Sequence, residues 1–582
     1  MAVNDLGRPC AAGRAGPTVG PRSVCRYLPV GGRHQGYGAT QPTDVDAART
    51  WDDKATRPAL WARRRLDNGW AVVMDKRIKR LGIFMVLCFV ALFIQLNNIQ
   101  ILKAHSLASS PLNPLVAKKA QSQPRGEILA SNGEVLARSV VAPKKSTYQY
   151  QRVYPAATAG LFADVVGWDS FNHGRFGVEA SYNQYLETHD RAPRSLRDLL
   201  TTRTVTDNVT LTVDPKLQQA MAQALDAIPA APPGISPQNT QASAVALDPT
   251  TGAILAMYST PTYDPNPLVS QHGKKENAAY TANVNAPGNP MLAKAYEDTN
   301  APGSTFKVVT SAAAYDHMPS LTTFDYPTTQ CIDLPQTNKQ LCNYGRESAA
   351  GAEPCGGTIQ DTLPQSCDTA FAQMGMSLQA VSMSGEAQAF GFNEVPPLDL
   401  PGVVKSNFPT VAALTNNDPA LAYSAFGQQN VTASALQMAL VAAGIANGGL
   451  IVTPHVMARI RDSQGNLVSS FTPSTWLRAT SPATAQAVTS LMQAVVSRGT
   501  ASSPPVFPAD ESVAAKTGTA EVGPNQDYTT DWMIAFAPAS HPKVVVAVVA
   551  PFRSKTETGA QVAGPATCAI LQAAIQSNQG RP

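Results

Sequence analysis

The sequence predicts a mixed α+β protein with one N-terminal transmembrane helix, a small mixed module and a larger domain built on a five-stranded antiparallel sheet. Three features support this fold class. A single long apolar run lies near the N-terminus, five apolar strand segments come from the two ends of residues 241–582, and helical segments lie between them. Strands drawn from both ends of one domain are typical of an antiparallel sheet that carries a helical insertion.

The N-terminal apolar run, residues 81–102, is the predicted transmembrane anchor. Its first part, Leu81–Ile94, has no charged side chain, and with the apolar residues that follow it approaches the length needed to cross a bilayer. Four cations directly precede it: Lys76, Arg77, Lys79 and Arg80. Because positive charge favours the cytoplasmic side, we expect a single pass with a cytoplasmic N-terminus. A cleaved signal peptide is the alternative, but no Ala-x-Ala site stands out after the run.

The segment before the anchor is basic. Residues 1–80 hold 15 Lys and Arg against 7 Asp and Glu, so the rest of the chain carries a net charge of −4. Its Gly, Pro and Arg content predicts a disordered cytoplasmic tail, and it shows no basic, aromatic module of the kind that binds nucleic acid. Met74 lies just before the cations and is a candidate for the true translation start, with residues 1–73 an upstream extension.

Residues 105–228 are predicted to form a separate mixed module. Asn132-Gly133 is a turn signal between two strand segments, and Asp214-Pro215 is a helix start. The acidic residues of this module are scattered along its sequence, so we assign no chemistry to it.

Residues 229–240 are rich in proline and are predicted to be a linker. Residues 241–582 then form the larger domain. Its strands are expected at residues 242–247, 253–258, 513–522, 532–537 and 544–550. Its inserted helices are expected at residues 433–447, 483–496 and 564–576.

The cysteines are consistent with an extracytoplasmic location, where disulfides persist. Close spacing predicts a Cys355–Cys367 bridge and favours a Cys331–Cys342 bridge less strongly, and Cys568 is left single. The sequence has neither a C-x-x-C pair nor a histidine cluster with the spacing of a zinc site. We therefore expect no metal and no cofactor.

The segment that most directly indicates chemistry is Ser304-x-x-Lys307. Pro302 and Gly303 interrupt the preceding chain, and the apolar residues after Ser304 predict the start of a buried helix. On such a helix Ser304 and Lys307 share one face. A serine hydroxyl becomes a nucleophile when a base takes its proton, and a lysine whose pKa is lowered by burial and nearby positive charge can be that base.

Two further motifs follow along the chain. Ser366–Asp368 begins a helix-like segment, and Lys516–Thr519 (Lys-Thr-Gly-Thr) lies in the expected strand 513–522. Each motif alone has a structural explanation; Lys516, for example, could be an edge-strand charge that discourages aggregation. Gly518 is expected to leave room for a substrate backbone along the strand. The three motifs in this order, each in a suitable local structure, indicate one catalytic site.

This combination of Ser-x-x-Lys, Ser-x-Asn/Asp and Lys-Thr-Gly resembles the motif set of penicillin-binding proteins and class A β-lactamases. The chain is most similar to class B penicillin-binding proteins of the actinobacterial PbpA type. Beyond the motifs, the resemblance includes Arg125–Gly126, Gly177–Glu179 and Ala425–Gln429, and it covers the chain from the anchor onward. It implies a transpeptidase domain with its sheet between helical layers, on a pedestal used for dimerisation or partner binding.

The resemblance also implies an activity, the cross-linking of peptidoglycan stem peptides that end in D-Ala-D-Ala, with covalent inhibition by β-lactams. Ser304 would be the nucleophile and Lys307 its base. Ser366, between Lys307 and Lys516, would relay the proton to the leaving amine. A membrane glycan polymerase and other wall-synthesis proteins of the cell membrane would be its partners in growth or division.

The same resemblance implies how the donor peptide is bound. Thr517 and Thr519 would hydrogen-bond the terminal carboxylate, and Lys516 would attract it by charge. Gly518 belongs to the same substrate-binding strand. The backbone N–H groups of Ser304 and Thr519 would form the oxyanion hole.

The second motif departs from the usual family pattern, because Asp368 stands where most members have Asn. The carboxylate replaces two N–H donors with acceptors only. We expect Asp368 to pair with Lys307 and so to raise the pKa of that lysine, which opposes its role as a base.

Other functions remain in view. A β-lactamase needs a deacylating base, and no glutamate between Ser366 and Lys516 stands in a Glu-x-x-x-Asn setting. A bifunctional glycosyltransferase needs a further domain for which 105–235 offers too little room. A β-lactam sensor would need a cytoplasmic effector domain. A non-catalytic scaffold of a wall-synthesis complex is a further alternative because of Asp368.

Overall fold

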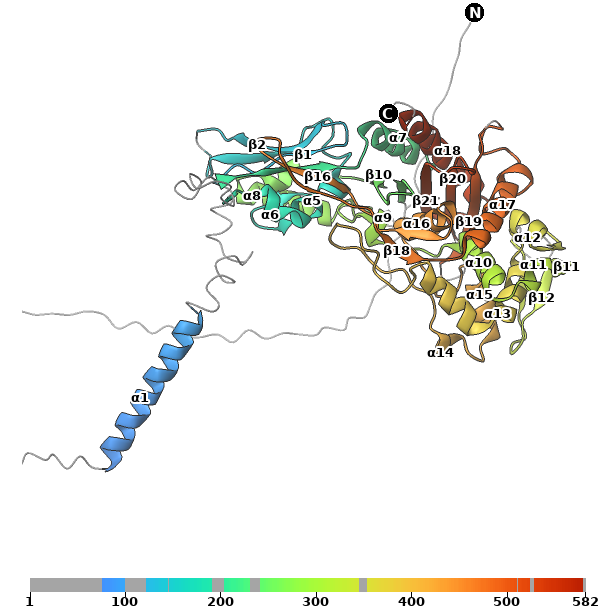
Figure 1. The fold of residues 1–582 in the computed structure, drawn as a ribbon, viewed down its shortest axis with the longest axis horizontal. Helices are drawn as coiled ribbons and strands as arrows, with labels where there is room; N and C mark the ends of the chain where they lie inside the picture. The colour runs from blue at the N-terminus through green and yellow to red at the C-terminus, as the bar shows by residue number, and fades with distance from the viewer. Residues whose placement is uncertain are drawn as a thin grey trace, which may run out of the picture. The chain divides into compact units, whose positions relative to one another are not determined.

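The computed structural model describes residues 76–99, 122–144, 146–190, 204–230, 241–344, 353–509, 511–523 and 528–578. Figure 1 shows the arrangement of its helices and strands. Residues 1–75 of the expected tail, Met74 among them, and residues 231–240 of the expected linker lie outside the described residues. Residues 76–80, which had been expected in the disordered tail, are helical instead.

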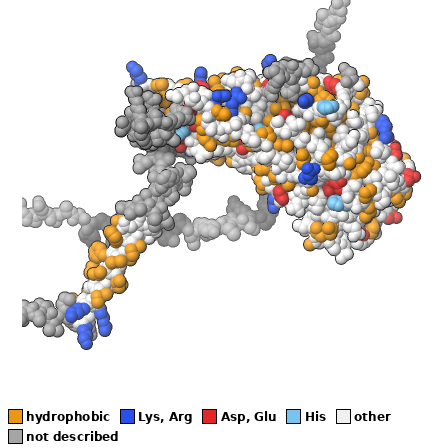
Figure 2. All heavy atoms as spheres, in the orientation of Figure 1, with side chains coloured by type: hydrophobic (Ala, Val, Ile, Leu, Met, Phe, Trp, Pro, Cys, Tyr) orange, Lys and Arg blue, Asp and Glu red, His pale blue; other side chains and the backbone are white. Residues whose placement is uncertain are grey.

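The N-terminal helix α1 spans Lys76–Asn97, and over Ile78–Asn97 it is long and apolar enough to cross a membrane. Its large apolar side chains are exposed along its length, and Figure 2 shows Lys and Arg side chains gathered at one end of the helix. The helix begins before the expected anchor 81–102, of which residues 100–102 lie outside the described residues. An exposed apolar helix of this length is what a membrane anchor requires.

The N-terminal module is built on a six-stranded sheet with the order β17-β16-β8-β1-β2-β3. The strands are β1 (Ile128–Leu129), β2 (Val135–Val141), β3 (Tyr150–Val153), β8 (Asp207–Leu211), β16 (Met457–Asp462) and β17 (Leu467–Ser470). Strands β1 and β8 pair parallel, and the other neighbours pair antiparallel. Residues 457–470 had been expected in the larger domain, yet they complete this sheet. Their partner strand lies far away in the sequence, so local alternation could not reveal the pairing.

Short elements surround this sheet. They are α4 (Ala163–Val166), β4 (Asp169–Ser170), β5 (Gly174–Arg175), α5 (Gly177–Ser181), α6 (Asn183–Leu186), β6 (His189–Asp190) and β7 (Thr204–Val205). Buried ion pairs connect them to the strands. Glu179 in α5 has no exposed surface and accepts hydrogen bonds from Arg125 Nε at 2.6 Å and Arg152 Nε at 2.5 Å. The two guanidinium groups compensate the buried carboxylate.

The larger domain contains a five-stranded sheet with the order β10-β9-β21-β20-β19, in which all neighbours pair antiparallel. Its strands are β9 (Ala242–Leu247), β10 (Ile254–Thr260), β19 (Ala514–Val522), β20 (Tyr528–Ala537) and β21 (Val544–Ser554). Alternate residues enter two separate cores; Val544 and Val546 lie in one, and Val545 and Ala547 lie in the other. Both faces of the sheet are therefore buried, which explains why β9, β10 and β21 are apolar at most positions.

Helices cover both faces of this sheet. Helices α7 (Pro215–Asp226) and α18 (Gly559–Asn578) lie side by side on one face (Figure 1), and α16 (Ala435–Ala446) packs on the other. Helix α7 had been expected in the N-terminal module 105–228. Its apolar residues, Met221 among them, instead join the core beneath α18.

The insertion between β10 and β19 contains further helices and short strands. The helices are η4 (Asn266–Val269), α8 (Gly273–Val284), α9 (Lys294–Glu297), η5 (Gly303–Phe306), α10 (Lys307–His317), α11 (Ser320–Thr323), α12 (Ile359–Gln365), α13 (Asp368–Ala389), α14 (Val411–Leu414), α15 (Asp418–Ser424) and α17 (Pro482–Arg498). The short strands are β11 (Tyr326–Thr329), β12 (Cys331–Asp333), β13 (Gln340–Cys342), β14 (Cys355–Gly357), β15 (Leu450–Val452) and β18 (Thr475–Arg478). Of these elements, η4 and α8 contact the N-terminal module.

The insertion holds two disulfides. Cys331 is joined to Cys342 across the β12–β13 hairpin, and Cys355 in β14 is joined to Cys367 at the start of α13. Cys568 has a free thiol. The second bridge fixes the backbone directly beside Ser366.

Candidate active site

Ser304 lies in a short 3₁₀ turn that leads directly into a buried helix. The turn η5 spans Gly303–Phe306 and α10 begins at Lys307. The expected helix therefore starts at the lysine rather than at the serine. A 3₁₀ turn places positions i and i+3 one above the other, so Ser304 and Lys307 still share a face.

Contacts with neighbouring strands fix this turn. Trp532 Nε1–H donates to Ala301 O at 2.8 Å, and Gly303 N–H donates to Gly427 O at 3.0 Å. Gly303 has a φ of +52°, and a Cβ there would lie 3.0 Å from Ala520. Glycine meets both the conformational and the steric demand, so the turn lies tightly against β19.

Lys307 is fully buried and directed at the second motif. Its Nζ donates to Asp368 Oδ1 at 2.7 Å, to Ser366 O at 2.5 Å and to Ser366 Oγ at 3.3 Å. Among the described residues, the hydroxyl of Ser304 has no hydrogen-bond partner. The Lys307–Asp368 pair expected from the sequence is thus present, and the Ser304 hydroxyl is not tied to another side chain.

Ser366 is the point at which both lysines meet. It follows α12 with φ 61° and ψ 41°, a left-handed conformation that is uncommon for a residue with a side chain and often found at functional sites. Lys516 Nζ donates to Ser366 Oγ at 2.9 Å and to Thr517 O at 2.8 Å. Both amines thus converge on the Ser366 hydroxyl, which lies between Lys307 and Lys516 as expected, and neither donates to the Ser304 oxygen.

Burial shifts both amines toward the neutral form, and like charge adds to the shift of Lys516. Burial lowers the pKa of Lys307, and the Asp368 carboxylate offsets part of this fall. Burial also lowers the pKa of Lys516 well below its usual value, and the neighbouring Lys307 lowers it further. Aromatic rings line the Lys307 ammonium, with the Phe371 centroid at 5.3 Å and the Phe426 centroid at 5.8 Å. Burial therefore favours the neutral amine, the form that can accept a proton.

Gly518 lies tightly against the serine turn. A Cβ at this position would lie 2.8 Å from Pro302 O, 2.9 Å from Thr305 Cγ2 and 3.0 Å from Trp532 Cβ. The glycine therefore allows strand β19 to approach the turn closely. Its expected place beside a substrate backbone stays a prediction.

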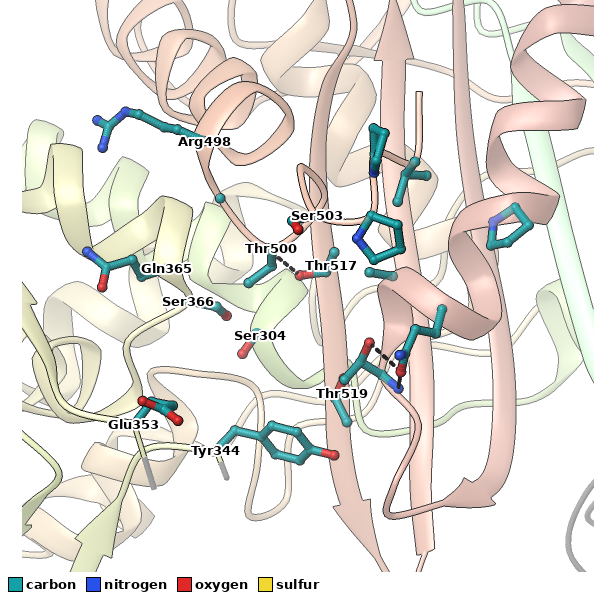
Figure 3. A pocket seen from close by; sticks show the side chains of 18 of the residues that line it. Ser304, Tyr344, Glu353, Gln365, Ser366, Arg498, Thr500, Ser503, Thr517 and Thr519 are labelled. Atoms are coloured by element: carbon teal, nitrogen blue, oxygen red, sulfur yellow. Dashed lines mark hydrogen bonds between the residues drawn. The ribbon is translucent and has the colours of Figure 1, made fainter. Parts of the chain in front are cut away.

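A cavity of about 1050 Å³ opens beside Ser304. Ser304, Ser366, Thr517 and Thr519 line it, and Figure 3 shows the two serines facing this space beside the strand that carries the threonines. The first turns of α18 and the loop after α17 form other parts of its wall. Its volume is at the upper end of the range for ligand pockets.

Hydrogen bonds attach the two threonines to these walls. Thr517 Oγ1 lies 2.7 Å from Thr500 Oγ1, and Thr519 Oγ1 accepts a hydrogen bond from Gly559 N–H at 3.0 Å. Within the described residues, no cluster of three or more His, Cys, Asp or Glu side chains could hold a metal ion.

Comparison with known proteins agrees with this geometry. Residues 242–572 match the family model of the penicillin binding protein transpeptidase domain, and residues 125–209 match that of the penicillin binding protein A dimerisation domain. The chain belongs to the penicillin-binding protein transpeptidase family.

Similar proteins align with this chain over most of its length. It is 34% identical over 519 residues to the peptidoglycan D,D-transpeptidase PbpA of Mycolicibacterium smegmatis, which covers 86% of this chain and 99% of the relative. It is 33% identical over 514 residues to the PbpA of Mycobacterium tuberculosis, with the same coverage of both chains.

Solved structures show the same fold. The ceftriaxone acyl-enzyme complex of penicillin-binding protein A from M. tuberculosis has a TM-score of 0.69 and 31% identity, and the match covers 79% of this chain and all of that chain. The penicillin G acyl-enzyme complex has a TM-score of 0.68 and 32% identity, with 78% of this chain covered.

One residue at the site of this penicillin-binding protein gave no sequence signal. Tyr344 lines the cavity, and its backbone N–H donates to Asp368 Oδ2 at 3.1 Å. Its hydroxyl donates to Lys555 O at 2.9 Å, so the side chain reaches from the second motif to the segment after β21 (Figure 3). Its role depends on contacts between segments far apart in the sequence, which no local pattern encodes.

Proposed function

We propose that this protein is a peptidoglycan D,D-transpeptidase that cross-links stem peptides through an acyl-enzyme formed on Ser304. The observation that carries the proposal is that Lys307 and Lys516 meet on Ser366 Oγ in the pocket that Ser304 lines. The family, the named transpeptidase relatives and the β-lactam acyl-enzyme complexes of a similar protein support it. A β-lactam would acylate Ser304 in place of D-Ala-D-Ala.

In the first step Ser304 Oγ attacks the carbonyl carbon of the penultimate D-Ala. Neutral Lys307 takes the hydroxyl proton. Catalytic hydrogen bonds often tighten when substrate binds, so we expect Lys307 Nζ to turn from Ser366 O toward Ser304 Oγ. The backbone N–H groups of Ser304 and Thr519 would stabilise the oxyanion, a contribution on the order of 10²–10³ in rate per donor.

Collapse of the tetrahedral intermediate breaks the amide C–N bond and leaves the acyl group on Ser304. Ser366, which accepts hydrogen bonds from both lysines, would pass a proton to the departing D-Ala nitrogen. The proton that Lys307 took from Ser304 would replace it.

The donor peptide would lie along the edge strand β19. Thr517 and Thr519 would hydrogen-bond its terminal carboxylate, with the backbone of Gly518 between them. Lys516 Nζ lies behind them, where it donates to Ser366 Oγ and to Thr517 O. We assign the carboxylate to these two threonines because both line the cavity that Ser304 also lines.

In the second step the neutral amine of another stem peptide attacks the ester carbonyl, and Lys307 takes the proton that this amine loses. A new amide bond forms, the ester bond to Ser304 breaks, and Lys307 returns that proton to the Ser304 oxygen. The product is a cross-link between two peptidoglycan strands.

We propose that α1 crosses the cell membrane once, with residues 1–80 in the cytoplasm and the catalytic domain outside. The cations at the start of α1 support this orientation. The N-terminal module, for which the matching family model is named a dimerisation domain, would bind a second copy or other wall-synthesis proteins, such as a membrane glycan polymerase. Met74 remains our candidate for the translation start.

A catalytically weak scaffold is the second candidate, because the Lys307–Asp368 ion pair opposes the base. The test combines fluorescent penicillin labelling with a cross-linking assay on a D-Ala-D-Ala stem peptide and an amine acceptor. A transpeptidase forms a long-lived adduct, releases D-Ala and yields the cross-linked dimer. An adduct without dimer favours the scaffold, and rapid turnover of the adduct favours a β-lactamase.

Ser503 offers a matched control for this experiment, because it lines the same cavity but lies outside the three motifs. Ser304→Ala should abolish both labelling and dimer formation. Ser503→Ala should keep both. Loss of labelling in both variants, or in neither, would contradict the assignment of the nucleophile.

A further inference from the structure

Asp531 is a buried carboxyl directly behind the proposed carboxylate-binding strand. It lies on β20 opposite Thr519 on β19, so both side chains project from the same face of the sheet. It has no exposed surface. Its Oδ2 accepts a 3.4 Å hydrogen bond from Thr529 Oγ1, and its Oδ1 has no hydrogen-bond partner among the described residues. A buried carboxylate with an unsatisfied oxygen is unfavourable.

The charges around Asp531 come from several elements. Glu557, before α18, repels the ionised carboxyl, and Arg553 on β21 attracts it. The Tyr344 hydroxyl also lies within range of its charge. Burial has the largest effect and raises the pKa of Asp531 to about 7, although Arg553 and the hydroxyls of Thr529 and Thr519 oppose the increase. The carboxyl therefore changes its charge near neutral pH.

The protonation state of the Asp531 carboxyl determines whether the Thr519 hydroxyl donates its hydrogen bond to Asp531 or to a ligand in the cavity. Thr519 Oγ1 already accepts a hydrogen bond from Gly559 N–H, and a hydroxyl has one proton and two lone pairs. If Asp531 is ionised, its carboxylate accepts a hydrogen bond from the Thr519 hydroxyl. That hydroxyl then presents only a lone pair to the pocket. If Asp531 is protonated, its O–H can donate to the second lone pair of Thr519. The Thr519 proton is then free for a ligand in the cavity.

We propose that Asp531 is a positioning residue that orients the Thr519 hydroxyl, so that the terminal carboxylate of the donor peptide binds when Asp531 holds a proton. This inference rests on the proposed transpeptidase function and names a regulator of the same site. Protonation of Asp531 favours binding of the substrate carboxylate for two reasons. It frees a donor for the substrate carboxylate, and it removes a buried negative charge from behind the subsite.

The test measures the second-order rate constant of acylation by penicillin G between about pH 5.5 and pH 9, in the wild type and in Asp531→Asn. The substituted amide donates to Thr519 at every pH. We expect the two proteins to match near pH 6, and the wild type to fall behind by about tenfold per pH unit above the midpoint. Other titrations, such as that of Lys307, affect both proteins and cancel in the ratio.

Two further measurements separate positioning from a structural role. Glu557→Gln removes the repulsion, so the wild-type midpoint should move to lower pH while the decline remains. Penicillin G methyl ester has no carboxylate, so its acylation of the unaltered protein should lack this decline. The second measurement needs no variant and remains informative if Asp531→Asn does not fold.

The inference is overturned if penicillin G and its methyl ester show the same decline, or if folded Asp531→Asn keeps the wild-type pH profile. Uniform loss of acylation at all pH values in that variant, with an unchanged melting temperature, would also overturn it. A wild type that penicillin does not acylate at any pH would instead refute the proposed function. The two failures are therefore distinguishable.

Discussion

Replacing Asp368 with Asn tests whether Lys307 acts as the base. The ammonium of Lys307 and the carboxylate of Asp368 lie 2.7 Å apart in a buried pair. Two unit charges at this distance attract by about 6 kcal/mol at an effective dielectric constant of about 20. The substituted amide keeps a carbonyl acceptor for the Lys307 ammonium, so part of this attraction remains. We therefore expect the pKa of Lys307 to fall, because the carboxylate that stabilises the ammonium is gone.

The sign of the effect follows from the role of the neutral amine. A lower pKa makes Lys307 neutral at lower pH, so the acidic limb of the acylation profile should move down by the same amount. At a pH on that limb, the second-order acylation constant should rise about 10- to 100-fold, and above the limb the ratio of variant to wild type should return to about one. Stopped-flow acylation with a chromogenic cephalosporin across the pH range measures this directly.

Asp333→Asn is the matched control, because it removes one negative charge from the exposed hairpin strand β12, where Gln340 is its hydrogen-bond partner. Its acidic limb should coincide with that of the wild type. Removing one partner of a buried ion pair costs about 3–5 kcal/mol when the other stays charged, so melting temperatures must accompany the rates. An unmoved limb in folded Asp368→Asn, or complete loss of acylation, would refute the proposed role of the pair.

Three other predictions concern the site and its support. Lys516→Met removes the amine that donates to Ser366 Oγ and should slow acylation by about 10²–10⁴-fold in the same stopped-flow assay; a change below about threefold contradicts the relay. The double variant Cys355→Ser, Cys367→Ser opens a bridge of sequence separation 12. It should lower the free energy of unfolding in denaturant by about 2–4 kcal/mol and should also reduce acylation. Removing the Cys331–Cys342 bridge is the control and should lower stability without changing acylation. Glu179→Gln leaves two buried guanidinium groups without their shared anion. It should destabilise the protein by about 3–5 kcal/mol and leave acylation per folded molecule unchanged. A loss of less than about 1 kcal/mol would show that these buried ion pairs do not stabilise the fold.

Local sequence signals were sufficient where one segment sets its own conformation. Pro302 and Gly303 before an apolar run mark the serine turn, and the segment 513–522 around Lys516 was expected as a strand and forms β19. The close spacing of Cys355 and Cys367 indicated their bridge. These patterns depend on neighbours along the chain.

Features that depend on distant segments could not be read in this way. The pairing of β16 with β8 joins residues about 250 positions apart in a register set by tertiary contacts. The left-handed conformation of Ser366 and the burial of Asp531 depend on what surrounds them. The sequence showed that Gly518 was needed, but the neighbour that requires it, Pro302, became visible only in three dimensions.

The most direct test of a reactive Ser304 is to acylate the protein with penicillin G, digest it and locate the added mass by tandem mass spectrometry. We expect one equivalent of adduct, on the peptide that contains Ser304, and none on that peptide in Ser304→Ala. An adduct on Ser366 or on the free thiol of Cys568, or no adduct on the folded protein, would contradict the central claim.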